Sequence, residues 1–96
     1  MNRAQFEADV RGEGYELSEG EIEPNVHRSA HVHEFDARVF VLEGSITLVL
    51  GAARRTYRPG DSCTVPAGTM HEEHTDADGV RYLAGRRPAA KVVAAE

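Results

Sequence analysis

The clearest signal of the fold lies between Gly60 and His71, in the sequence GDSCTVPAGTMH. It follows Pro59, and the Pro-Gly pair predicts a tight turn because proline presets φ while glycine accepts positive φ. Residues 63–65 then read as a short strand that ends at a second turn, the Pro-Ala-Gly of residues 66–68. The stretch therefore predicts two short strands joined by a turn that leads into a histidine.

Further short strands are predicted on both sides of this stretch. Residues 39–42 and 46–50 are apolar runs separated by a Glu-Gly pair, and they read as adjacent antiparallel strands. A closing strand is expected at residues 80–84, after a turn-like segment at residues 76–79. Turns thus recur about every eight to ten residues, which is typical of an all-β barrel or sandwich.

The N-terminus is expected to form the one helix. Phe6 and Val10 lie one helical turn apart, and Asn2 is placed to cap a helix over residues 3–11 that ends at one of the following glycines. A chain of 96 residues supports a single hydrophobic core. We therefore expect one domain.

The predicted domain divides into three parts: a helical segment at residues 1–14, a β core at about residues 15–85, and a tail at residues 86–96. In that tail only Val92 and Val93 look able to pack. A barrel this small buries little apolar surface, so we expect it to pair with a second copy as a homodimer.

The composition excludes two classes of partner. A formal net charge of -5 and a pI near 5.5 argue against nucleic-acid binding, which needs a basic surface. No apolar run approaches the ~20 residues of a membrane-spanning helix, and the first residues lack the hydrophobic stretch of a signal peptide.

The single cysteine, Cys63, cannot form an internal disulfide, which agrees with a reducing compartment. We expect a cytoplasmic protein.

Three of the five histidines are placed where they could converge. His31 and His33 are two residues apart, so on one extended strand both rings would project from the same face, roughly 6 to 7 Å apart. His71 follows the Pro-Ala-Gly turn, and its ring would lie beside those of His31 and His33 if its strand were adjacent to theirs. Neutral imidazole is a common ligand of Fe, Zn, Mn, Ni and Cu ions. These three residues are therefore the candidate ligands of one divalent metal ion.

Two motifs resemble those of the cupin superfamily. Residues 25–44, with His31-Val32-His33 and a final glycine, are similar to the first cupin motif, and residues 60–71 are similar to the second. The resemblance covers about residues 15–85, with 15 residues between the motifs. It implies a small antiparallel jelly-roll barrel in which His31, His33 and His71 hold a metal ion.

The chain departs from the family pattern at two positions. Counted back from Gly44, the position of the usual glutamate ligand is Ala37, and counted forward from His33 with the longer spacing it is Arg38. Neither residue can serve as that ligand. The second motif often ends in asparagine, and that position is Thr75. Alternation places Glu73 on the same face as His71, so Glu73 is the best candidate for the fourth ligand. The other candidates for that role are Glu34, Asp36 and His74.

The missing glutamate affects the expected chemistry. Three imidazoles cancel none of the charge of the ion, which would stay a strong Lewis acid and favour an anionic substrate. The resemblance then points to the three-histidine dioxygenases, with an isomerase, decarboxylase or lyase as further reactions. Glu73 and His74 are the candidate catalytic residues. The alternative is a cupin that binds or senses a small ligand without catalysis, with or without metal.

Several other residues are assigned structural roles. Arg81 reads as a solvated strand charge, and His27 as a loop residue. Cys63 reads as a strand thiol more than as part of the site. Barrel packing is expected of the remaining aromatic and β-branched candidates, namely Phe35, Val39, Val41, Tyr57 and Tyr82.

Overall fold

A computed structural model describes residues 1–89 of the chain, so the valines predicted to pack in the tail lie outside the described residues. One helix, α1 (Arg3–Gly12), precedes eight strands. These are β1 (Glu16–Ile22), β2 (His27–His31), β3 (Phe35–Gly44), β4 (Ile46–Leu50), β5 (Ala53–Tyr57), β6 (Ser62–Val65), β7 (His71–His74) and β8 (Val80–Pro88). No helix in this part of the chain is long and apolar enough to cross a membrane.

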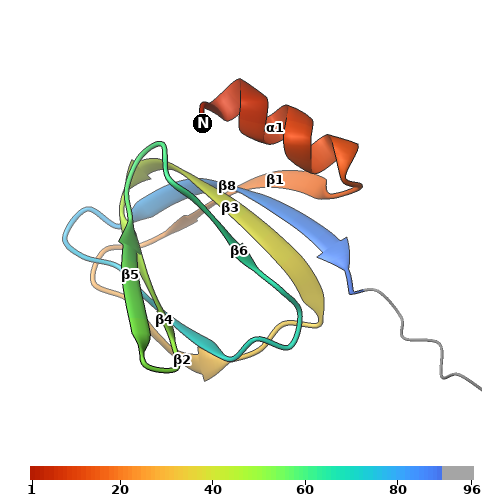
Figure 1. Ribbon diagram of the computed structural model, residues 1–96. Coiled ribbons are helices and arrows are strands. Elements are labelled where there is room, and N and C mark those ends of the chain that lie inside the picture. Colours follow the sequence, from red (N-terminus) through yellow and green to blue (C-terminus); the bar gives the residue numbers. More distant parts are fainter. Residues whose placement is uncertain (90–96) are drawn as a thin grey trace, which may run out of the picture.

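The strands form two antiparallel sheets that face each other (Figure 1). Their orders are β1-β8-β3-β6 and β2-β7-β4-β5. Helix α1 lies across the outer face of the first sheet, above β1, β8 and β3 (Figure 1). The predicted all-β barrel with an N-terminal helix is therefore confirmed.

The helix begins where its sequence predicts. The Asn2 side chain accepts a hydrogen bond of 2.9 Å from the backbone N–H of Gln5, which satisfies a donor that the first turn leaves free. Phe6 and Val10 are fully buried against the sheet, and the Phe6 ring lies 5.4 Å from that of Phe40. Packing of this apolar face attaches the helix to the barrel.

Strand β3 is covered on both faces, which explains its continuous apolar run. Val41 faces the interior of the barrel and joins a core with Ile46, Leu48 and Val65. Its neighbour Phe40 faces the opposite way, into the cluster beneath α1. A strand covered on both sides loses the apolar-polar alternation of a half-exposed one.

A β-bulge in β2 sets the orientation of the side chains along the β2–β7 ladder. The paired residues are His27 with His74, Arg28 with Glu73, and His31 with His71, so β2 has one extra residue between Arg28 and His31. Regular alternation would place His27 and His31 on one face. The extra residue reverses the phase, so that Arg28 and His31 both point toward Glu73 on the inner face, whereas His27 lies on the outer face beside Glu72.

Three strand predictions are corrected by this arrangement. The strands at residues 39–42 and 46–50 are not adjacent in one sheet, because β3 pairs with β6 and β8 whereas β4 pairs with β5 and β7. His27 begins β2 and is not a loop residue. His31 and His33 do not share a strand, because β2 ends at His31 and His33 lies in the link that carries the chain from one sheet to the other. The two rings nevertheless meet, since the link turns at the edge of the barrel.

Candidate metal centre

Four side chains from three segments converge in the barrel interior. His31 ends β2, His33 lies in the β2–β3 link, and His71 and Glu73 share the inner face of β7. One ligand atom from each residue lies within 4.8 Å of the others. The three ring centroids are 4.4 to 5.0 Å apart. The group is therefore compact enough to surround a single ion.

Backbone carbonyls hold two of the imidazoles in one tautomer. His31 Nδ1 lies 2.7 Å from the carbonyl oxygen of Ser29, and His71 Nδ1 lies 2.9 Å from that of Thr69. A carbonyl oxygen can only accept a hydrogen bond, so each Nδ1 carries the proton. The Nε2 atom of each neutral ring is then left with a free lone pair, which is the arrangement of a metal-ligating histidine.

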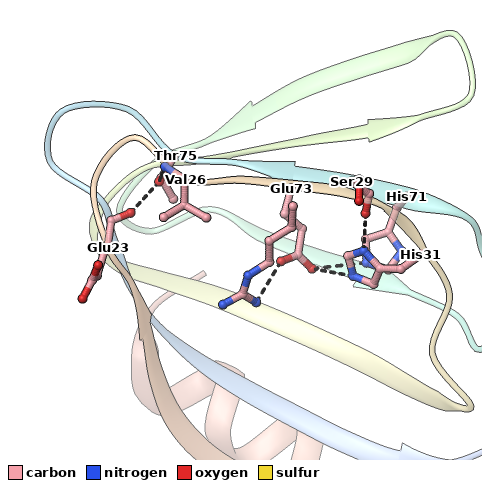
Figure 2. A network of polar contacts seen from close by, with 8 residues as sticks. Glu23, Val26, Ser29, His31, His71, Glu73 and Thr75 are labelled. Carbon is pink, nitrogen blue, oxygen red and sulfur yellow. Dashed lines mark hydrogen bonds and ion pairs between the residues drawn. The ribbon is translucent and has the colours of Figure 1, made fainter.

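Glu73 faces both of these nitrogen atoms. Its Oε1 lies 3.2 Å from His71 Nε2 and 3.5 Å from His31 Nε2 (Figure 2). Its other oxygen, Oε2, pairs with Arg28 Nη1 at 3.3 Å. Two nitrogen lone pairs and a carboxylate oxygen thus point at one another, and only a shared proton or a cation can make this arrangement favourable.

The environment of His33 keeps its ring neutral. Burial, followed by the nearby His71 and His31, lowers the pKa of His33 below its usual value. The ring stacks on Phe35 with centroids 4.6 Å apart. A neutral ring in a fixed orientation is suited to metal binding.

The Pro-Ala-Gly turn positions the link that carries His33. The backbone N–H of Gly68 donates to the carbonyl oxygen of His33 at 2.9 Å, and the N–H of Ala67 donates to Asp36 Oδ1 at 2.9 Å. Asp36 also pairs with Arg87 at 3.4 Å, and the Ala67 hydrogen bond is the main cause of its lowered pKa. Residues of the second sequence motif therefore hold the backbone of the first in place through hydrogen bonds.

A cavity of about 90 Å³ is lined by three of the four side chains, His33, His71 and Glu73. Its walls are mainly apolar, and they include Ala37, at the position where the sequence pattern anticipates a glutamate. Ala37 is buried, so a longer side chain there would fill part of this space. Two cations, Arg28 and Arg86, also line the cavity.

The cupin domain family, Cupin_2, matches residues 18–84. The chain belongs to the cupin family. A search of curated proteins found no match.

Solved structures similar to this cupin include enzymes. The polyketide cyclase RemF from Streptomyces resistomycificus is 31% identical with a TM-score of 0.65, over 85% of this chain and 63% of that one. KdgF from a Halomonas species is 21% identical with a TM-score of 0.66, over 77% and 69%. The DMSP lyase DddQ from Ruegeria pomeroyi is 20% identical with a TM-score of 0.68, over 80% and 40%. The last two likenesses show the fold alone.

The remaining fourth-ligand candidates lie apart from the centre of this cupin. His74 belongs to a different cluster, with His27 and Glu72, because alternation along β7 turns it outward. Asp36 is engaged by Ala67 and Arg87, and Glu34 is exposed. Glu73 is the carboxylate that the structure places beside the three histidines.

Some residues assigned to packing also line the cavity, namely Phe35, Val39 and Tyr82. Cys63 does so as well, and burial raises the pKa of its thiol to about 11, so the thiol stays protonated at neutral pH. Arg81 pairs with Glu19 and Glu43 and takes no part in the cavity, which agrees with its reading as a strand charge.

Sequence reasoning missed Arg28, which contacts Glu73 and lines the cavity. Strict alternation from His31 would have turned Arg28 outward. The bulge that turns it inward leaves no recognisable mark in residues 28–31, so no sequence signal identified this residue.

Proposed function

We propose that this cupin binds one divalent transition-metal ion through His31, His33, His71 and Glu73, and uses it to act on a small anionic organic molecule. The observation that carries the proposal is the meeting of the Nε2 atoms of His71 and His31 with one carboxylate oxygen of Glu73, at 3.2 and 3.5 Å. Three nitrogen ligands and one oxygen ligand suit Zn, Fe, Mn, Ni or Cu ions. When bound, such an ion would polarise an oxygen atom of the substrate.

Neighbouring groups of the chain would orient the four ligands before the ion binds. The carbonyls of Ser29 and Thr69 keep the Nδ1 protons in place, which fixes the direction of each ring. Arg28 holds Glu73 Oε2, so that Oε1 stays directed at the histidines. This support limits the rearrangement that ion binding requires.

Charge and shape favour an anionic substrate. Glu73 supplies one negative charge, whereas the ion, Arg28 and Arg86 supply a positive excess at the cavity. The apolar walls would exclude water from the remainder of the ligand. We propose a small carboxylate or an enolisable carbonyl compound, and the 31% identity to a polyketide cyclase supports testing the second class first.

Dioxygenase chemistry has less support from this geometry than from the sequence pattern. The expectation rested on three histidines without a carboxylate, and Glu73 now stands beside them. Oxygen activation, isomerisation, decarboxylation and elimination are all reactions to assay. The alternative, ligand binding or sensing without catalysis, predicts saturable binding with no turnover.

Metal binding should be measured on untagged protein by mass spectrometry and by competition with a chromogenic chelator. We expect near one equivalent in the interior site, lost in His33→Ala and bound at least about 10-fold more weakly in Glu73→Gln. Glu34→Gln is the matched control, because Glu34 is an exposed carboxylate near the site. The affinity of the Glu34→Gln variant for the metal ion should equal that of the wild type.

Activity should then be assayed with metal-loaded protein on β-dicarbonyl compounds and small carboxylates, with oxygen consumption followed in parallel. Turnover that disappears in His33→Ala supports the enzyme. Ligand binding without product in every assay favours the sensing alternative. If His33→Ala and Glu73→Gln bind the interior ion as tightly as Glu34→Gln does, the proposed centre is wrong.

A further inference from the structure

A second group of metal-ligating side chains lies outside the interior site. It consists of His27, Glu72 and His74, whose ligand atoms all lie within 4.8 Å of one another. Alternation along β7 directs Glu72 and His74 away from the interior, and the bulge in β2 does the same for His27. The five histidines of the chain thus divide between two clusters, three inside the barrel and two outside.

The spacing of the three groups is close to that of ligands on one ion. Glu72 Oε1 lies 2.8 Å from His27 Nε2 and 3.6 Å from His74 Nε2. Ligands 2.0 to 2.2 Å from a tetrahedral zinc ion lie about 3.4 Å from one another. The His27 side chain is 58% exposed, so a small rotation can open its shorter contact. The two imidazole rings are stacked, with centroids 4.1 Å apart.

Two features of this cluster favour the binding of a cation. His74 Nε2 is a buried atom with no hydrogen-bond partner among residues 1–89. Within the same range, the ion-pair partners of Glu72 are His27 and His74 alone, whereas Glu73 is shared with an arginine. A buried nitrogen without a partner is costly, and a bound ion would remove that cost.

We propose that His27, Glu72 and His74 form a second site, for a divalent transition ion such as Zn²⁺ or Ni²⁺. Two imidazoles and one carboxylate are a donor set that such ions accept, with coordination positions left open for water. The ion would tie β2 to β7 at the end of the ladder opposite His31 and His71. Its occupancy would therefore steady the strand pair that carries the interior ligands.

The test is the number of ions bound by untagged protein after removal of metal and dialysis against micromolar Zn²⁺. Wild type should bind two equivalents. His27→Ala and His33→Ala should each bind one, and the double variant should bind none. Because the two single variants remove different sites, loss of the interior site and loss of the outer site are distinguished.

Two further variants make the result decisive. Glu72→Gln keeps the size of the side chain and should also reduce binding to one equivalent, while Glu43→Gln, an exposed carboxylate outside both clusters, should retain two. Circular dichroism of each variant should match that of the wild type. The second site is excluded if folded His27→Ala and Glu72→Gln bind as many ions as Glu43→Gln.

Discussion

At the residue scale, Thr75 shows how one hydroxyl group can join separate segments. Its Oγ1 donates to the carbonyl oxygen of Glu23 at 2.6 Å and accepts from the N–H of Val26 at 3.0 Å (Figure 2). Thr75 stands where the related motif often has asparagine, and it is buried. It therefore fastens the β1–β2 link to the end of β7, directly after the strand of His71 and Glu73.

Replacing this hydroxyl with a methyl group should destabilise the protein. Thr75→Val keeps the volume but leaves the N–H of Val26 and the carbonyl oxygen of Glu23, both partly buried, without their partner, at a cost of about 1 to 3 kcal/mol in the free energy of unfolding. Urea denaturation measures it. Thr64→Val, at an exposed strand position, is the control and should change stability little. Equal stability of the two variants would show that the Thr75 hydrogen bonds contribute nothing.

At the scale of the elements, the turn from β3 to β4, which carries the chain from the first sheet to the second, depends on a close approach of two backbones. Gly44 has a φ of 74°, and a Cβ atom at this position would overlap the carbonyl oxygen of Gly79. Gly79 also holds this turn in place, because the N–H of Ser45 donates to the same carbonyl oxygen at 3.0 Å. Only glycine fits both the conformation and the space.

Alanine at this position should therefore weaken the barrel. Gly44→Ala combines an unfavourable φ with a backbone clash, and we expect a loss of about 3 kcal/mol in unfolding free energy. Gly51→Ala is the matched control, since Gly51 has a φ of 59° but open space around it, and its cost should be only about 1 kcal/mol. Guanidinium denaturation of both variants measures the difference between their unfolding free energies. Equal losses in the two variants would mean that only the backbone conformation, and not the clash with Gly79, carries a cost.

At the scale of the whole molecule, the proposed interior ion would link the second sheet to the β2–β3 connection. His31, His71 and Glu73 belong to β2 and β7, while His33 lies on the way to the first sheet. An ion that binds only this folded arrangement must stabilise it. The homodimer expected from the small core stays a prediction, which a measurement of mass in solution checks.

Metal should accordingly raise the melting temperature of the chain. At a free ion concentration about 100 times the Kd, binding contributes about 2.7 kcal/mol, which corresponds to roughly 10 to 20 °C for a domain of this size. Scanning calorimetry with and without Zn²⁺ measures the shift, and His33→Ala is the control. A shift of the same size in that variant would mean that the stabilisation does not come from the interior site.

The fold class, the capped helix and the short strands between turns could all be predicted from the amino-acid sequence. These features are local, because hydrophobic periodicity, proline and glycine act over a few residues. The proximity of His71 and Glu73 was predictable for the same reason, since alternation along one strand puts them on one face. The two motifs also pointed to the pairing of the histidines, through resemblance.

The set of side chains that surrounds the site depends instead on tertiary packing. The bulge in β2 turns Arg28 inward and separates His27 from His31, although the three lie within five residues of sequence. The cavity beside Ala37 and the outer cluster with His74 likewise depend on which strands are neighbours. Bulges and strand order are set by packing between segments distant in sequence, where local propensity has no influence.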